Sequence, residues 1–204
     1  MNSSTCISKM RRAFAAITIS IVVLFSPGVS PRCATDLHNA FSSFVIEAEA
    51  AMSFKISTPS FSNGGNIAQK FTCDGADVSP QLSWSEPPSG AKTLALLVDD
   101  PDAPVGNWNH WTMWNVPATV RSLTEGVPKD AELPDGSRQG QNDFRKIGYN
   151  GPCPPAGKPH RYYFKLYALG AKLDLKPAAT KKDVEAAMKG HILAQSDWMG
   201  RYGR

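Results

Sequence analysis

The sequence predicts a mostly β domain of antiparallel strands, with one or two helices late in the chain. Short runs of alternating polar and apolar residues recur from residue 54 onwards, and clusters of turn-forming residues separate them. Glycine and proline together supply 32 of the 204 residues, more than the usual share of roughly 12%, as expected when many turns join short elements. A convincing helical period is found only beyond residue 180.

The strands expected from these patterns differ in how they are buried. Alternating runs predict short strands, whereas residues 93–98 are almost continuously apolar and predict a strand buried on both faces. In order, the expected strands are residues 54–57, 68–72, 82–84, 93–98, 110–116 and 162–169, with 198–202 as a candidate closing strand.

One helix is expected at residues 180–192. Thr180 and Asp183 match a capping box, with Asp in the place of the usual Glu. The apolar residues that follow fall on one face at helical spacing up to Ile192, and His191 lies on that face. We therefore expect His191 to pack against the domain or to complement the dipole at the helix C-terminus.

The N-terminal 51 residues differ from the rest of the chain. A basic stretch before residue 13 and an uncharged apolar run at 13–25, ended by Pro27 and Gly28, predict a signal peptide or anchor over residues 1–28. Residues 29–51 then form a linker, and residues 52–204 form the domain. A second interpretation takes Met52 as the true start. The domain is exported to the periplasm or secreted in the first case and cytoplasmic in the second.

Two cysteines lie within the predicted domain, Cys73 and Cys153, and the others are Cys6 and Cys33. No pair has the C-x-x-C spacing of a zinc or redox site. If the domain is exported, Cys73 and Cys153 are candidates for a disulfide, and if it is cytosolic, they are two buried thiols. We expect their Cα atoms to lie within disulfide reach, roughly 4.4–6.8 Å.

The net charge of +4 and the absence of any block of five like charges argue against a nucleic-acid partner that binds a basic tail. Apolar residues make up 42% of the chain and charged residues 20%. These shares exclude a wholly disordered chain and a coiled coil.

Three segments place polar side chains at strand edges. Residues 99–104 hold three carboxylates and two prolines that restrict the backbone. Residues 108–111 contain a histidine, which could bind a ligand while a carboxylate orients it. Residues 151–162 form a Pro/Gly-rich loop whose N–H groups could bind an anion. Each segment alone has an ordinary structural explanation, as a turn, a core histidine or a loop, but together they predict one shared site.

The motifs in these segments resemble the phosphatidylethanolamine-binding protein family, in particular its prokaryotic branch of Raf-kinase-inhibitor-like proteins. They are DPDAP at 100–104, WxH at 108–110 and GPxPPxGxxHRY at 151–162, with FxCDG at 71–75, SPxLxW at 79–84 and QNDF at 141–144 in support. The resemblance covers residues 53–204. Asn109 departs from it, because eukaryotic members often have a histidine there, and no counterpart of their C-terminal helix follows Tyr202.

The resemblance implies an antiparallel Greek-key β-sandwich with a small surface pocket for phosphate-like anions. Its ligand-binding residues would be Asp100, Asp102, Pro104, Trp108, His110, Pro155, His160 and Tyr162. The four Asp and His side chains should then converge, although up to 60 residues separate them. Pairing with the carboxylates should raise the pKa of both imidazoles and favour the cation that an anion needs.

The predicted function is that of a non-enzymatic binding protein for a small phosphorylated or anionic ligand, with no cofactor. Modulation of a protein partner is a further option, and membrane contact would come only through an uncleaved leader. The alternative is a hydrolase or metal-dependent enzyme that uses the same Asp/His pocket. No G-x-S-x-G nucleophile elbow supports a hydrolase, although Ser79 could serve if it lay beside a site histidine.

Overall fold

The computed structural model of the protein describes residues 54–204. The predicted leader, the linker, Met52, Cys6 and Cys33 therefore lie outside the described residues. No helix within the described part of the chain has both the length and the apolar character needed to span a membrane.

Strands dominate the described residues, and one α-helix lies near the C-terminus, as the sequence predicts. The elements in chain order are β1 (Ile56–Ser57), η1 (Gln69–Phe71), β2 (Leu82–Trp84), β3 (Thr93–Asp100), β4 (Trp108–Pro117), β5 (Ser122–Leu123), β6 (Arg138–Gln141), β7 (His160–Leu169), β8 (Ala178–Thr180), α3 (Lys181–Met188) and β9 (Ile192–Tyr202).

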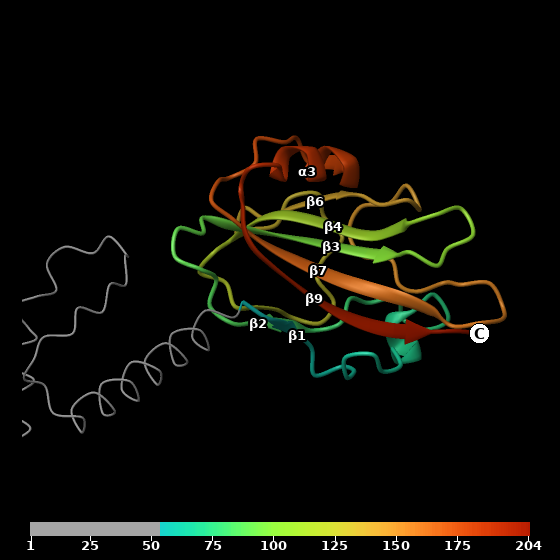
Figure 1. Cartoon of the computed structure of the whole chain (residues 1–204). Helices are drawn as coiled ribbons and strands as arrows, with labels where there is room; N and C mark the ends of the chain where they lie inside the picture. The colour runs from blue at the N-terminus through green and yellow to red at the C-terminus, as the bar shows by residue number, and fades with distance from the viewer. Residues whose placement is uncertain (1–53) are drawn as a thin grey trace, which may run out of the picture. The chain divides into compact units, whose positions relative to one another are not determined.

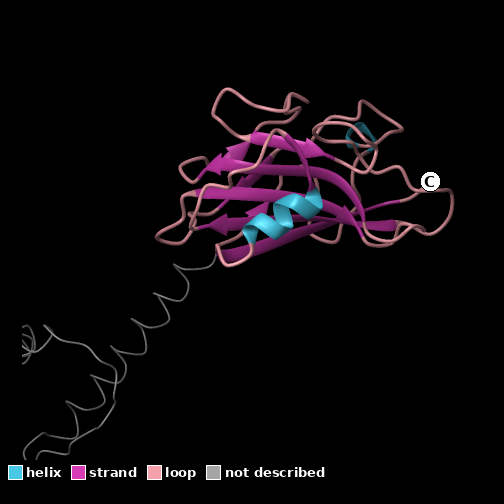
Figure 2. Ribbon diagram, turned by 90° about the horizontal axis from the view of Figure 1, so that it is seen from above, coloured by secondary structure: helices cyan, strands magenta, loops and turns pink. Residues whose placement is uncertain are grey.

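These strands form two sheets. The larger has six strands in the order β8-β6-β4-β3-β7-β9, and the smaller has three in the order β1-β2-β5. Every pair of neighbouring strands is antiparallel except β6 and β8. Figure 1 shows α3 on one side of the larger sheet and β1 and β2 on the other, and Figure 2 shows α3 lying across the strands. The Greek-key order stays a prediction.

β3 lies inside the larger sheet and is buried along its whole length, which the apolar run predicts for residues 93–98 but not for Asp99 and Asp100. Leu94, Leu96 and Val98 belong to the main core cluster, which also includes residues of the smaller sheet. Ala95 and Leu97 belong to a second cluster beneath α3. The alternation follows from the two-residue period of a strand, since successive side chains point to opposite faces.

The predicted strand at residues 68–72 is wrong. Residues Gln69–Phe71 form a 3₁₀ turn, which the Thr72 hydroxyl closes by donating to the Gln69 carbonyl at 2.9 Å. Only Phe71 of the turn is buried. A single anchored aromatic residue between polar neighbours produces the same alternation as a strand, so the pattern could not separate the two.

The predicted helix begins where expected but is shorter. Thr180 is its N-cap, and both halves of the capping box with Asp183 are present. The helix ends at Met188, and Gly190 then adopts a φ of 79°, which favours glycine and turns the chain into β9. His191 is therefore exposed beyond the helix, so its predicted place on the apolar helix face is wrong.

Candidate functional site

The end of β3 and the start of β7 lie side by side because the two strands are antiparallel neighbours. Asp100 is the last residue of β3, and His160 is the first of β7. His160 Nδ1 donates to Asp100 Oδ2 at 2.8 Å, and the two side chains are only 11% and 5% exposed. The fold thus brings together two residues that are 60 positions apart in the sequence, and their hydrogen bond orients the imidazole.

Asp102 has a different partner from the histidines that the sequence suggested. Arg161 donates to it three times, from Nε at 2.9 Å, from Nη2 at 2.7 Å and from the backbone N–H at 2.9 Å. The hydrogen bonds from Arg161 hold the pKa of Asp102 well below its usual range. Asp102 is therefore an anion whose charge Arg161 offsets. Arg161 belongs to the motif at 151–162, but the motif does not predict this role.

His110 is buried on β4, and its ring is held from behind. Nδ1 lies 2.7 Å from the Asn150 carbonyl oxygen, which can only accept, so Nδ1 carries the proton in this contact. Burial lowers the pKa of His110 and outweighs the opposing effects of the Asn150 carbonyl and Asp100. The predicted rise in the pKa of this imidazole is therefore wrong. In the neutral ring, Nε2 is a hydrogen-bond acceptor.

Aromatic rings surround His110. It makes edge contacts with Phe144 and with Tyr162, each at a centroid distance of 5.2 Å, and Trp108 in turn contacts Phe144 at 5.4 Å. Burial and the Asp100 carboxylate raise the pKa of Tyr162, so its hydroxyl stays protonated. Phe144 lies in the QNDF motif but is not one of the predicted site residues.

A cavity of about 320 Å³ opens beside the Asp100–His160 pair. It is lined by Asp102, Pro155, Ala156, Lys158, Pro159 and His160. Three predicted site residues are thus on its wall. Asp100 is buried against His160, Tyr162 is buried against His110, and Pro104 is exposed in the loop after β3. Lys158, a cation on the wall, was not among the predicted site residues.

Two polar residues next to the site, Asp99 on β3 and Asn109 on β4, belong to a separate network of hydrogen bonds and ion pairs. Buried Asn109 donates through Nδ2 to the carbonyls of Val98 and Trp111, both at 3.1 Å, and to Asp99 at 3.2 Å. Asp99 also pairs with Lys181 at 2.8 Å and with Lys165 at 3.1 Å. Burial alone would raise the pKa of Asp99, but the two lysines lower it below its usual value.

The contacts of Ser79 bear on the hydrolase alternative. Ser79 Oγ accepts the N–H of Val127 at 3.0 Å instead of meeting a site histidine. Within residues 54–204, no group of three or more His, Cys, Asp or Glu side chains is placed to hold a metal ion.

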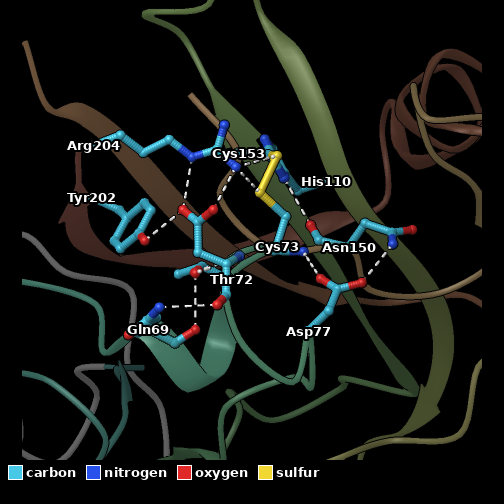
Figure 3. Close-up of a disulfide and its surroundings, with 11 residues drawn as sticks. Gln69, Thr72, Cys73, Asp77, His110, Asn150, Cys153, Tyr202 and Arg204 are labelled. Carbon is cyan, nitrogen blue, oxygen red and sulfur yellow. Dashed lines mark hydrogen bonds and ion pairs between the residues drawn. A yellow bond between two sulfur atoms is a disulfide. The ribbon is translucent and has the colours of Figure 1, made fainter. Parts of the chain in front are cut away.

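A disulfide holds the loop that carries Pro155. Cys73 and Cys153 are bonded with Cα atoms 5.4 Å apart, within the predicted reach (Figure 3). Asp77 also holds this loop, because it accepts hydrogen bonds from the Gly151 N–H at 2.6 Å and from the Asn150 side-chain amide at 2.8 Å. These contacts place the Asn150 carbonyl against His110.

Known proteins resemble this chain in sequence and in fold. The sequence model of the phosphatidylethanolamine-binding protein family matches residues 57–203. A UPF0098 protein of Methanothermobacter thermautotrophicus is 50% identical over 149 residues, which are 73% of this chain and 98% of that relative. A UPF0098 protein of Chlamydia muridarum is 43% identical over 153 residues, which are 72% of this chain and 97% of that relative.

Two crystal structures are similar to the described domain. A putative phosphatidylethanolamine-binding protein homologue from Chlamydia trachomatis, CT736, has a TM-score of 0.69 at 39% identity, over 74% of this chain and 98% of that one. YbcL of E. coli, described as a new member of the mammalian family, has a TM-score of 0.70 at 35% identity, over the same shares. The chain therefore belongs to the phosphatidylethanolamine-binding protein family.

Proposed function

We propose that the domain is a binding protein for a small phosphorylated or anionic ligand that enters the cavity beside His160. The observation that carries this proposal is the buried Asp100–His160 pair at the cavity wall. Since Nδ1 of His160 donates to Asp100, Nε2 is the ring nitrogen left for a ligand, and it donates to an anion in the imidazolium form of the ring. Lys158 supplies a second positive charge on the same wall.

The acidic residues of the site suit a ligand that also carries an amine. Asp102 on the cavity wall and Asp100 behind His160 are two carboxylates, and Arg161 offsets the charge of only one of them. The name of the family refers to phosphatidylethanolamine, whose head group combines a phosphate with an ammonium. We therefore propose phosphoethanolamine-like groups as the ligand class, with the phosphate at His160 and Lys158 and the amine at Asp102.

Titration calorimetry on the purified protein tests this function. Phosphoethanolamine and inorganic phosphate are titrated into the wild type, into His160→Ala and into His191→Ala, the last being a matched control because His191 is exposed outside the site. Loss of a charge-assisted hydrogen bond predicts a fall in affinity of about tenfold or more for His160→Ala only. Unchanged affinity in a folded His160→Ala protein, or binding that strengthens as the pH rises, would sink the proposal.

We propose further that the domain works in an oxidising compartment outside the cytoplasm. The disulfide supports this, because such bonds persist mainly in exported proteins. The intact mass of the protein purified from its native host tests it. We expect the mass of a chain that begins near residue 29 or further on and contains one disulfide. A chain that starts at Met52 with free thiols would instead support the cytoplasmic interpretation.

A further inference from the structure

A fixed positive charge lies against the disulfide. Arg204, which follows β9, places Nη2 2.8 Å from Cys73 Sγ and 3.3 Å from Cys153 Sγ. Both cysteines are exposed. Figure 3 shows the Arg204 side chain reaching across to the two sulfur atoms, with Tyr202 on its other side. The bond is therefore open to a reagent from solvent and also has a hydrogen-bond donor beside it.

The arginine is held in place by a carboxylate. Asp74 accepts from Arg204 Nε and Nη2, both at 2.7 Å, and from the Tyr202 hydroxyl at 2.7 Å. The hydrogen bonds from Arg204 and Tyr202 lower the pKa of Asp74, and Asp74 raises the pKa of Arg204. The pair stays ionised at neutral pH, so Nη2 is oriented toward the sulfur atoms without further rearrangement.

The place of the Arg204 guanidinium bears on how the disulfide would react in thiol–disulfide exchange. An attacking thiolate bonds to one sulfur, and the other sulfur leaves with the electron pair of the broken bond. The reaction is faster when the leaving thiolate is stabilised, and a neighbouring guanidinium stabilises a thiolate. Because Nη2 is closer to Cys73 than to Cys153, Cys73 is the better leaving group.

We propose that the Cys73–Cys153 disulfide is a site of thiol–disulfide exchange with an external dithiol, in which Cys153 is attacked and Cys73 leaves as a thiolate held by Arg204. The attack forms a mixed disulfide between Cys153 and the dithiol. The second thiolate of the dithiol then attacks its own bonded sulfur and releases Cys153. The protein gains two electrons and two protons, and the dithiol is oxidised to its disulfide.

Neighbouring groups limit the size of the effect. Asp74 carries a negative charge next to Cys73 and offsets part of the charge of Arg204. A stabilisation of about one pKa unit in the leaving thiolate, of which about half is expressed in the rate, corresponds to a change of about threefold. The effect is therefore small enough to need rate measurements and large enough to resolve.

The first experiment determines which sulfur is attacked in the wild-type full chain. The protein is treated briefly with 2-mercaptoethanol, quenched with acid, alkylated at the free thiols and digested with trypsin. Cys73 and Cys153 fall in separate peptides, since Lys92 and Lys146 lie between them. The expected product has 2-mercaptoethanol on Cys153 and the alkyl group on Cys73. Equal adducts, or adducts mainly on Cys73, would overturn the proposal.

The second experiment measures the rate of reduction by dithiothreitol in the wild type and two variants. Arg204→Gln should react about threefold more slowly than the wild type, because the leaving thiolate of Cys73 then lacks the guanidinium. Arg201→Gln is the matched control, since it removes the same charge from an exposed position on β9. If Arg204 only tethers the segment after β9 to Asp74, Arg204→Gln would loosen the disulfide and speed its reduction, which would contradict the proposal.

Discussion

Removal of the Cys73–Cys153 disulfide should lower the free energy of unfolding by about 4 kcal/mol. The bond joins residues separated by 80 positions. The chain-entropy relation gives about 4.5 kcal/mol for a loop of this length at 25 °C. Both cysteines are exposed, so replacing them by serine adds no buried polar group and creates no cavity in the core.

The native contacts around the bond should survive its removal. The Cys73 N–H donates to the Pro152 carbonyl at 3.1 Å, and the Tyr149 hydroxyl donates to the Phe71 carbonyl at 2.7 Å. Asp77 still holds Gly151. The loop therefore stays docked in the folded state, and the loss of stability arises mainly because the unfolded chain gains freedom.

Urea unfolding of the wild type and of a Cys73→Ser/Cys153→Ser variant measures this loss. The midpoint of thermal unfolding should fall by about 10 °C, since about 1 kcal/mol corresponds to about 2–4 °C in a domain of this size. Wild-type protein reduced with dithiothreitol serves as the control and should match the variant. A loss below about 1 kcal/mol would show that the unfolded chain is already constrained near these residues, and would refute the reasoning.

Three further predictions concern charged groups. Asp99→Asn should destabilise the domain by about 2 kcal/mol in urea unfolding, because Lys181 loses its buried partner. Since the pKa of Asp99 is lowered, the wild type should lose this stability as the pH falls below about 4. The stability of the variant should depend less on pH over the same range. In an NMR titration, His110 should protonate only below about pH 6.5, since burial lowers its pKa, and a higher midpoint would contradict its neutral state. Lys158→Gln should weaken phosphate binding about threefold at low salt, whereas Lys55→Gln should not, and the difference should shrink at high salt.

The sequence determined those features that depend on local patterns. The burial of residues 93–98 in β3 follows from an apolar run that no solvent-facing strand would carry, whereas the burial of Asp99 and Asp100 does not. The capping box at Thr180 follows from two side chains three residues apart. The polar segments at strand ends, together with the family resemblance, were enough to predict that Asp100 and His160 share one site.

The tertiary structure decided which partner each polar group meets. The motif placed Asp102 among histidines, but the antiparallel pairing of β3 with β7 sets Asp102 beside Arg161. Arg161 donates three hydrogen bonds to its carboxylate. Likewise, a histidine near carboxylates was expected to gain charge, but His110 is enclosed by aromatic rings, and burial outweighs the distant charges. Hydrogen bonding and desolvation act over a few ångströms in three dimensions, and spacing along the chain does not specify either of them.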